Sequence, residues 1–140
     1  MEQLNNIIYE DIVKTTNDGR IQLIENTIKS FERNKYPIKI DQYELYLILD
    51  EAISNAMEHG NKWNIEKKVR LTVYKPIDDT VMVEVEDEGN GFNPELIPQK
   101  ISADSPLSPR GRGIIIIKKF CNIAWDKSGK IIKLFINLKK

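Results

Sequence analysis

The sequence predicts an α+β fold of two layers, in which a mixed, mostly antiparallel sheet carries its helices on one face. Three observations favour this class. Segments with strand and helix periodicity follow one another in the order β-α-α-β-β-loop-α-β-β. The later strands come in adjacent pairs, which favours antiparallel pairing. The length of 140 residues is typical of one domain, so residues 1–140 are expected to form a single unit.

The N-terminal part is expected to contain one strand and one helix. Residues 6–13 mix apolar and polar side chains, which is typical of an edge strand. Thr16 and Asn17 are both favourable N-cap residues, so the helix is expected to begin there. It should continue to about Asn34, because apolar side chains recur at helical spacing at Ile21, Ile24, Ile28 and Phe31.

The second helix has a clear beginning and end in the sequence. Asp41 and Glu44 have the spacing of a capping box, with aspartate in the place of serine or threonine. Gly60 can end the helix. Between them the apolar side chains keep the i, i+3, i+4, i+7 pattern, at Leu45, Ile48, Leu49, Ala52, Ile53, Ala56 and Met57.

The second half of the chain is predicted to begin with two strands, at residues 69–74 and 81–87. The loop at residues 88–113 then holds four of the six prolines and four of the seven glycines. A loop longer than about 15 residues is often a functional lid, and we expect a lid at about residues 93–113. A helix and two further strands should complete the fold, at residues 114–120, 122–126 and 131–138.

Composition excludes several classes of function. Lys plus Arg and Asp plus Glu both total 21, and this balance argues against a general nucleic-acid binder. The longest apolar run, residues 114–117, is too short to cross a bilayer, and the N-terminus lacks the pattern of a signal peptide. The lone cysteine, Cys121, cannot form an internal disulfide. These features together favour a cytoplasmic protein. The lone histidine, His59, excludes multi-histidine metal sites and most Ser-His-Asp hydrolases.

Three groups of residues could carry chemistry, and the first lies on the second helix. Glu51, Asn55 and His59 follow one another at intervals of about one turn, at the border of the apolar stripe. A carboxylate there could accept a proton from a nucleophile. An amide oxygen there could bind Mg2+, which prefers oxygen ligands. The alternative is a solvated polar pair on an amphipathic helix.

The second group follows the predicted strand at residues 81–87. Asp87 has the same parity as Val81, Val83 and Val85, so its carboxylate should face the core and require a hydrogen-bond donor, such as the amino group of adenine. Gly89 and Gly91, before Phe92, allow the backbone to approach a ligand closely. The alternative is an ordinary Asp/Gly turn.

The third group precedes the predicted helix at residues 114–120. Gly111 and Gly113 would leave free N–H groups at the helix N-terminus, which is a favourable site for phosphate. Arg110 and Arg112 add positive charge beside it. The alternative is a flexible hinge with solvated arginines.

Taken together, these motifs resemble those of the GHKL ATPase superfamily, which has the Bergerat ATP-binding fold. Residues 51–60 are similar to its N box, residues 87–92 to its first glycine box and residues 111–113 to its second. The resemblance extends over about residues 17–138. One departure lies in the final hairpin, where members often place a threonine after the glycine and this sequence has Lys130.

Within the superfamily, the chain is most similar to bacterial anti-sigma-factor serine/threonine kinases. Gyrase, MutL and Hsp90-type members carry large additional domains that this sequence lacks. A sensor histidine kinase would need a phosphoacceptor histidine on a dimerisation helix, whereas His59 lies inside the nucleotide motif.

The resemblance implies roles for individual residues. Glu51 would be the general base that deprotonates the substrate hydroxyl, and Asn55 would bind the Mg2+ that bridges the phosphates of ATP. Asp87 would accept the adenine amino group. The other nucleotide-binding residues would be His59, Gly89, Gly91, Phe92, Arg110, Gly111, Arg112, Gly113 and Ile114.

The implied function is that of an ATP- and Mg2+-dependent protein serine/threonine kinase and anti-sigma factor. Its partners would be a sigma factor and an antagonist protein that receives the phosphoryl group, and it would form a homodimer, with no direct contact to nucleic acid or membrane. The first alternative is a nucleotide-dependent binding module without kinase activity. The second is a detached catalytic domain that phosphorylates histidine or aspartate on another protein.

Overall fold

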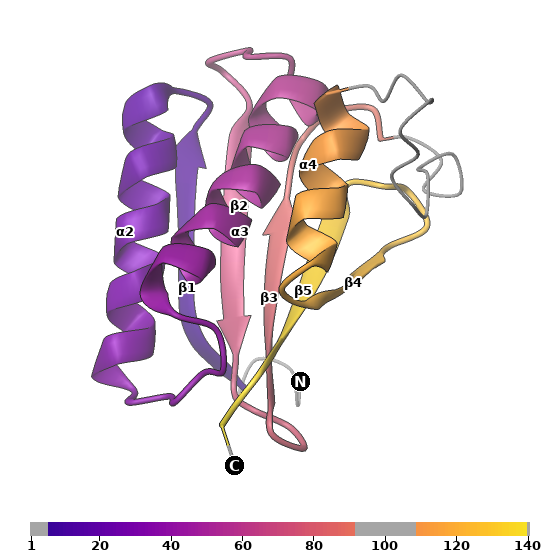
Figure 1. The fold of residues 1–140 in the computed structure, drawn as a ribbon. Helices are drawn as coiled ribbons and strands as arrows, with labels where there is room; N and C mark the ends of the chain where they lie inside the picture. The colour runs from indigo at the N-terminus through magenta and orange to yellow at the C-terminus, as the bar shows by residue number, and fades with distance from the viewer. Residues whose placement is uncertain (1–5, 92–108, 140) are drawn as a thin grey trace.

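The computed structural model describes residues 6–91 and 109–139 (Figure 1). Its elements are β1 (Ile7–Lys14), α2 (Asn17–Arg33), α3 (Gln42–Asn55), the π-helical turn η1 (Ala56–Gly60), β2 (Lys68–Tyr74), β3 (Thr80–Glu86), α4 (Pro109–Lys118), β4 (Asn122–Trp125) and β5 (Ile131–Asn137). The predicted order of strands and helices is confirmed. No helix in these two ranges is long and apolar enough to span a membrane.

The five strands form one sheet in the order β1-β2-β3-β5-β4. Each neighbouring pair is antiparallel, so the described sheet is antiparallel throughout and not mixed. Figure 1 shows α2, α3 and α4 side by side on one face of this sheet. The predicted α+β class, with two layers and helices on one face, is therefore confirmed.

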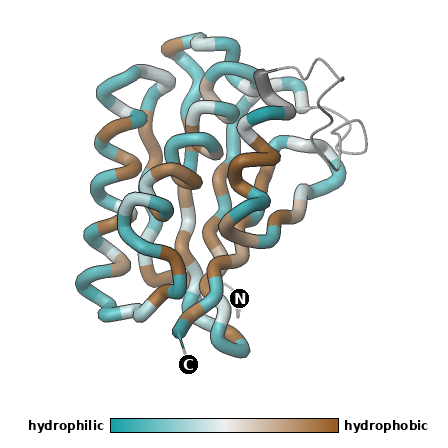
Figure 2. Tube along the Cα trace, viewed as in Figure 1, coloured by the Kyte–Doolittle hydropathy of each residue, from teal (hydrophilic) through white to brown (hydrophobic). Residues whose placement is uncertain are grey.

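The core fills the space between the sheet and the helices. Along β3, Val81, Val83 and Val85 are buried, whereas the residues between them are only partly buried on the other face. Figure 2 shows hydrophobic residues along the central strands and in α4. Period-2 alternation therefore places one face of each strand against the helices.

Both predicted helix starts are present. The side chain of Thr16 accepts a hydrogen bond from the N–H of Gly19 at 2.9 Å. At the start of α3, Asp41 and Glu44 form both hydrogen bonds of a capping box. These caps satisfy N–H groups that have no partner within the helix, and so determine where α2 and α3 begin.

Two elements near the predicted motifs differ from the expectation. The helix α3 does not run regularly to Gly60, because it widens at Ala56 into the π-helical turn η1. The helix α4 begins at Pro109 and not after Gly113. Proline has a φ angle suited to the first helical position and needs no N–H partner there, which allows the earlier start.

Candidate functional site

Glu51 and Asn55 of α3 lie beside Gly113 of α4. A Cβ atom added to Gly113 would lie 2.7 Å from Oε2 of Glu51 and 3.5 Å from Nδ2 of Asn55. The two helices pack against each other at this point (Figure 1). The missing side chain of Gly113 therefore lets the start of α4 approach the carboxylate and the amide closely.

Asn55 is a buried amide with an unsatisfied donor. The residue is 7% exposed, and its Nδ2 atom has no hydrogen-bond partner among the described residues. Buried polar atoms nearly always have a partner, and an exception requires an explanation such as a ligand. The amide also carries an oxygen of the type that Mg2+ prefers. Asn55 therefore fits a site that holds a polar ligand, a metal ion or both.

Glu51 is a partly buried carboxyl group with a raised pKa. Burial is the main cause of the rise, and the negative charge of Asp50 adds to it. Both effects disfavour the charged carboxylate and make it a better proton acceptor. Enzymes use a raised carboxyl pKa of this kind to tune a general base.

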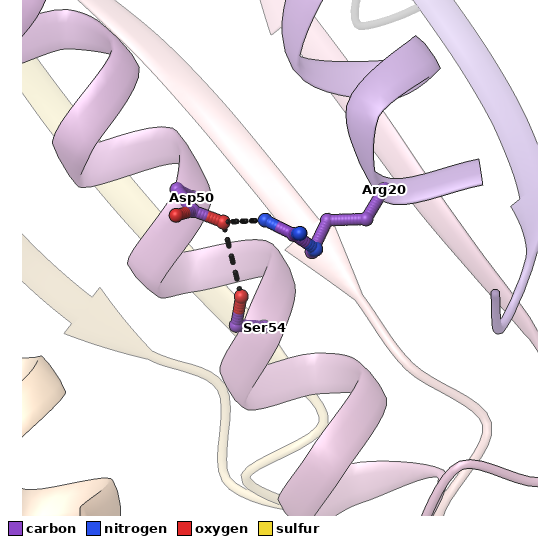
Figure 3. A network of polar contacts seen from close by, with 3 residues as sticks. All are labelled: Arg20, Asp50 and Ser54. Atoms are coloured by element: carbon purple, nitrogen blue, oxygen red, sulfur yellow. Dashed lines mark hydrogen bonds and ion pairs between the residues drawn. The ribbon is translucent and has the colours of Figure 1, made fainter. Parts of the chain in front are cut away.

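Asp50, the neighbour of Glu51, belongs to a separate polar network (Figure 3). Its Oδ1 atom lies 2.5 Å from Nη1 of Arg20 on α2, and it accepts a hydrogen bond from the hydroxyl of Ser54 at 3.1 Å. Successive residues of a helix point about 100° apart. Asp50 therefore joins α3 to α2, while Glu51 lies near Gly113 of α4.

Asp87 lies directly after β3, against the π-helical turn. The residue is 5% exposed, and its carboxylate accepts a hydrogen bond from the N–H of Gly89 at 2.8 Å. A Cβ atom on Gly60 would overlap the carboxyl group of Asp87, and one on Gly89 would overlap the carbonyl of Gly60. The N–H of Asp87 donates to the carbonyl of Lys130 at 3.0 Å. The beginning of the second predicted motif therefore packs on the end of the first.

Asn55 and Asp87 both line a small cavity between α3 and the sheet, with room for about one water molecule. Its lining consists of Ala52, Asn55, Ala56, Val85, Asp87, Trp125, Lys130 and Ile132. A larger hollow on the open face of the sheet is lined by none of the predicted site residues, so we assign the site to the small cavity and the adjoining Glu51.

Other predicted residues lie at varied positions. Gly91 has a φ of +78° and packs so closely on the carbonyl of Ser128 that only glycine fits. Arg112 is exposed, whereas Ile114 is fully buried in the core. Phe92 and the predicted lid at residues 93–108 lie outside the described residues. For Arg110 and Gly111, only their place in the first turn of α4 is described.

His59 lies beyond the regular α-helix that carries Glu51 and Asn55. It lies in the π-helical turn, where each turn of backbone takes more residues than in an α-helix. Its Nε2 atom is 3.7 Å from a carboxylate oxygen of Glu58. The predicted spacing of about one turn from Asn55 to His59 assumed an uninterrupted α-helix, whereas the regular helix ends at Asn55.

The structure also adds residues that the motifs did not single out. Asn61 is buried. Its side-chain Nδ2 atom donates hydrogen bonds to the hydroxyl of Thr15 at 2.9 Å and to the carbonyl of Lys68 at 3.0 Å. Its Oδ1 atom accepts a hydrogen bond from the N–H of Glu88 at 2.8 Å. These hydrogen bonds therefore link three separate segments of the chain near the site, which contain Thr15, Lys68 and Glu88. The only signal for Asn61 in the sequence is its position directly after Gly60.

Comparisons with known proteins agree with this geometry. Residues 17–134 match the family of the histidine kinase-like ATPase domain. The chain belongs to this family. The superfamily predicted from the three motifs is thus confirmed.

Its relatives include bacterial anti-sigma factors. The chain is 31% identical over 120 residues to the anti-sigma F factor of Bacillus subtilis, covering 81% of this chain and 82% of that protein. It is 30% identical to the anti-sigma F factor of Bacillus velezensis over the same shares. It is also 27% identical to the putative sensor histidine kinase NtrY-like of Rickettsia felis, over 92% of this chain but only 23% of that protein.

A solved structure supports the fold. The mycobacterial sensor histidine kinase MprB superposes with a TM-score of 0.55, covering 92% of this chain and 99% of that chain, at 14% sequence identity. At this low identity, the likeness shows that the two proteins share a fold.

The contact between Gly60 and Asp87 gives a prediction about stability. Gly60→Ala should lower the free energy of unfolding by about 1–3 kcal/mol, because the new methyl group must displace the carboxyl group of Asp87. In an Asp87→Ala background the same methyl group should cost much less. Urea denaturation of the two single variants and the double variant measures this coupling. Equal costs in both backgrounds would contradict the contact.

Proposed function

We propose that this protein is an ATP-dependent serine/threonine kinase and anti-sigma factor. It would transfer the γ-phosphoryl group of ATP to a hydroxyl group of an anti-sigma-factor antagonist. Membership of the ATPase-domain family and the anti-sigma F factor relatives support this proposal. The observation that carries it is the joint placement of Asn55 and Asp87 around one cavity, with Glu51 adjoining it.

The polar groups of the cavity suit the two ends of ATP. The buried carboxylate of Asp87 offers an acceptor for the amino group of adenine. Toward the phosphates, the first turn of α4 contains Arg110 and Gly111, and N–H groups in the first turn of a helix have no partner within it. These N–H groups and the positive end of the helix dipole would hold phosphate oxygens.

The amide oxygen of Asn55 is the proposed ligand for Mg2+. The described residues contain no cluster of three or more histidine, cysteine, aspartate or glutamate side chains that could hold a metal ion. Mg2+ commonly takes only one or two protein ligands and completes its shell with phosphates and water, so Asn55 fits this role. When bound, the ion would neutralise charge that develops on the phosphates during transfer.

Glu51 is the proposed general base. The hydroxyl oxygen of the substrate forms a bond to the γ-phosphorus, the bond from that phosphorus to the β-phosphate bridge oxygen breaks, and ADP leaves. The hydroxyl proton passes to the carboxylate of Glu51. The raised pKa of this group makes it a suitable acceptor.

The proposed partners are a sigma factor and its antagonist protein, in keeping with the names of the anti-sigma F factor relatives. Sequestration and phosphorylation would then compete for one protein surface. We also propose a homodimer. Analytical ultracentrifugation with and without Mg-ATP would measure the oligomeric state.

Nucleotide binding is the first test of this function. Asp87→Asn and Asn55→Ala should each weaken Mg-ATP binding by about tenfold or more, because the first replaces a buried carboxylate with an uncharged amide, which is a weaker acceptor, and the second removes a buried amide. Isothermal titration calorimetry measures the affinities. Asp78→Asn, in the exposed turn between β2 and β3, is the matched control and should bind like the wild type. Unchanged binding in the Asp87 and Asn55 variants would contradict the assignment of the cavity.

Phosphoryl transfer separates a kinase from a binding module. Glu51→Ala should retain Mg-ATP binding but lose transfer to a purified antagonist protein by about 100-fold or more, since it removes a general base. Quantitative phosphorylation assays measure the rate. The product should be stable in acid, as a serine or threonine phosphate is. An acid-labile product would indicate histidine or aspartate as the acceptor, and no transfer by the wild type would indicate a binding module.

The pKa of Glu51 predicts the pH dependence of transfer. Because the base acts when deprotonated, the single-turnover rate should fall as the pH drops through the raised pKa of Glu51. Asp50→Asn removes the neighbouring negative charge and so lowers this pKa, which moves the acid limb of the profile to lower pH. Asparagine still offers an acceptor to Arg20 and Ser54. An acid limb at the same pH in both proteins would contradict the role of Asp50.

A further inference from the structure

The face of α3 that is turned away from the sheet carries apolar side chains that lie outside the core. Tyr43 is 75% exposed and Tyr46 is 38% exposed, and Leu47 beside them is only partly buried. In the part of the chain that the structure describes, none of the three belongs to the hydrophobic core or to the side chains packed against it. Apolar side chains that lie together on a surface in this way mark an interaction site.

One stripe of this face leads to the proposed general base. Tyr43, Leu47 and Glu51 follow one another at intervals of four residues, so they are neighbours on the same side of the helix. Glu51 in turn lies beside Gly113 at the start of α4. Because the helix rises 1.5 Å per residue, Tyr43 lies about 12 Å from Glu51 along the axis. The apolar side chains and the carboxylate therefore form one continuous surface.

A second stripe borders the first on the side of α2. Tyr46, Asp50 and Ser54 are again four residues apart. Asp50 forms an ion pair with Arg20 of α2 and accepts a hydrogen bond from Ser54 (Figure 3). The charges of this stripe are thus paired within the protein. What the face offers to a partner is therefore mainly apolar contact with the two tyrosine rings.

The phosphoacceptor protein is the occupant that fits this face. Its hydroxyl group must reach Glu51, so during transfer it must cover the surface around that residue. A standard protein interface buries about 800 Å2 on each partner, which for a round patch is a radius of about 16 Å. A patch of this size around Glu51 reaches Tyr43, which is about 12 Å away along α3.

We propose that Tyr43, Tyr46 and Leu47 form a docking site for the phosphoacceptor protein. This inference rests on the proposed function, since it takes Glu51 as the general base. The partner would place an apolar side chain on the tyrosine rings, about 12 Å from the hydroxyl group that it presents to Glu51, a distance that about four residues of extended chain cover. Tyrosine is enriched among the residues that dominate binding energy in interfaces. This contact would supply affinity for the partner and leave the chemical step to Glu51.

Transfer kinetics with the whole chain and a purified antagonist protein test this inference. Tyr43→Ala should raise the KM for the antagonist about 10- to 30-fold and leave kcat within about twofold of the wild type, because it removes binding and not chemistry. Tyr43→Phe keeps the ring and should stay within about threefold of the wild-type KM. Tyr46→Ala should also raise the KM, by a smaller factor because less of that residue is exposed.

Two controls isolate docking from other effects. Tyr43→Ala should bind Mg-ATP like the wild type in isothermal titration calorimetry, because Tyr43 lies about two turns from Glu51. Ile77→Ala removes an equally accessible apolar side chain, 67% exposed in the turn between β2 and β3, and should keep the wild-type KM. Circular dichroism verifies that each variant is folded.

The outcomes separate this inference from the proposed function. If the wild type transfers phosphate and Tyr43→Ala has the wild-type KM, the partner does not dock on this face and only this inference falls. A lower kcat at an unchanged KM has the same meaning, since the substitution would then act on the chemical step. If the wild type transfers no phosphate to the antagonist, the proposed function and this inference both fall.

Discussion

The packing of the Asp87 carboxyl group on the backbone of Gly60 is the constraint on which the site depends. Two segments that are far apart in the chain meet there, and neither glycine of the contact, Gly60 or Gly89, has room for a side chain. A charged group in such a place needs hydrogen bonds, and the N–H of Gly89 supplies one. The close approach therefore fixes the position of the carboxylate in the wall of the cavity.

The polar groups of α3 have different tasks although they are close in sequence. Asp50 forms an ion pair with Arg20 and so links two helices, while Glu51 lies beside Gly113 and the start of α4. Burial and the charge of Asp50 both raise the pKa of Glu51. The packing of three helices on one sheet thus separates a carboxylate that links two helices from the adjacent one that we propose as the general base.

Much of the fold follows from local sequence signals. The two places where the structure differs from the predicted elements, at Ala56 and at Pro109, are also local. The caps at Thr16 and Asp41 and the alternation along β3 predicted the corresponding elements well. The widened turn at Ala56 has no comparable signal, since its residues fit an α-helix as well as a π-helical turn. The early start of α4 could have been inferred from Pro109, which is a favourable first helical residue. Trp125 went unnoticed because it lies in a short strand outside every motif.

By itself, the sequence determined the fold class, the superfamily and the residues of the three motifs. Periodicity, caps and glycine spacing act over a few residues and can be recognised without a structure. Only the tertiary structure decided which of these residues share a cavity. Asn55, Asp87, Trp125 and Lys130 come from different parts of the chain, and their meeting depends on strand order and on how closely α3 approaches the sheet. Those distances follow from the packing of the whole core, which no local pattern encodes.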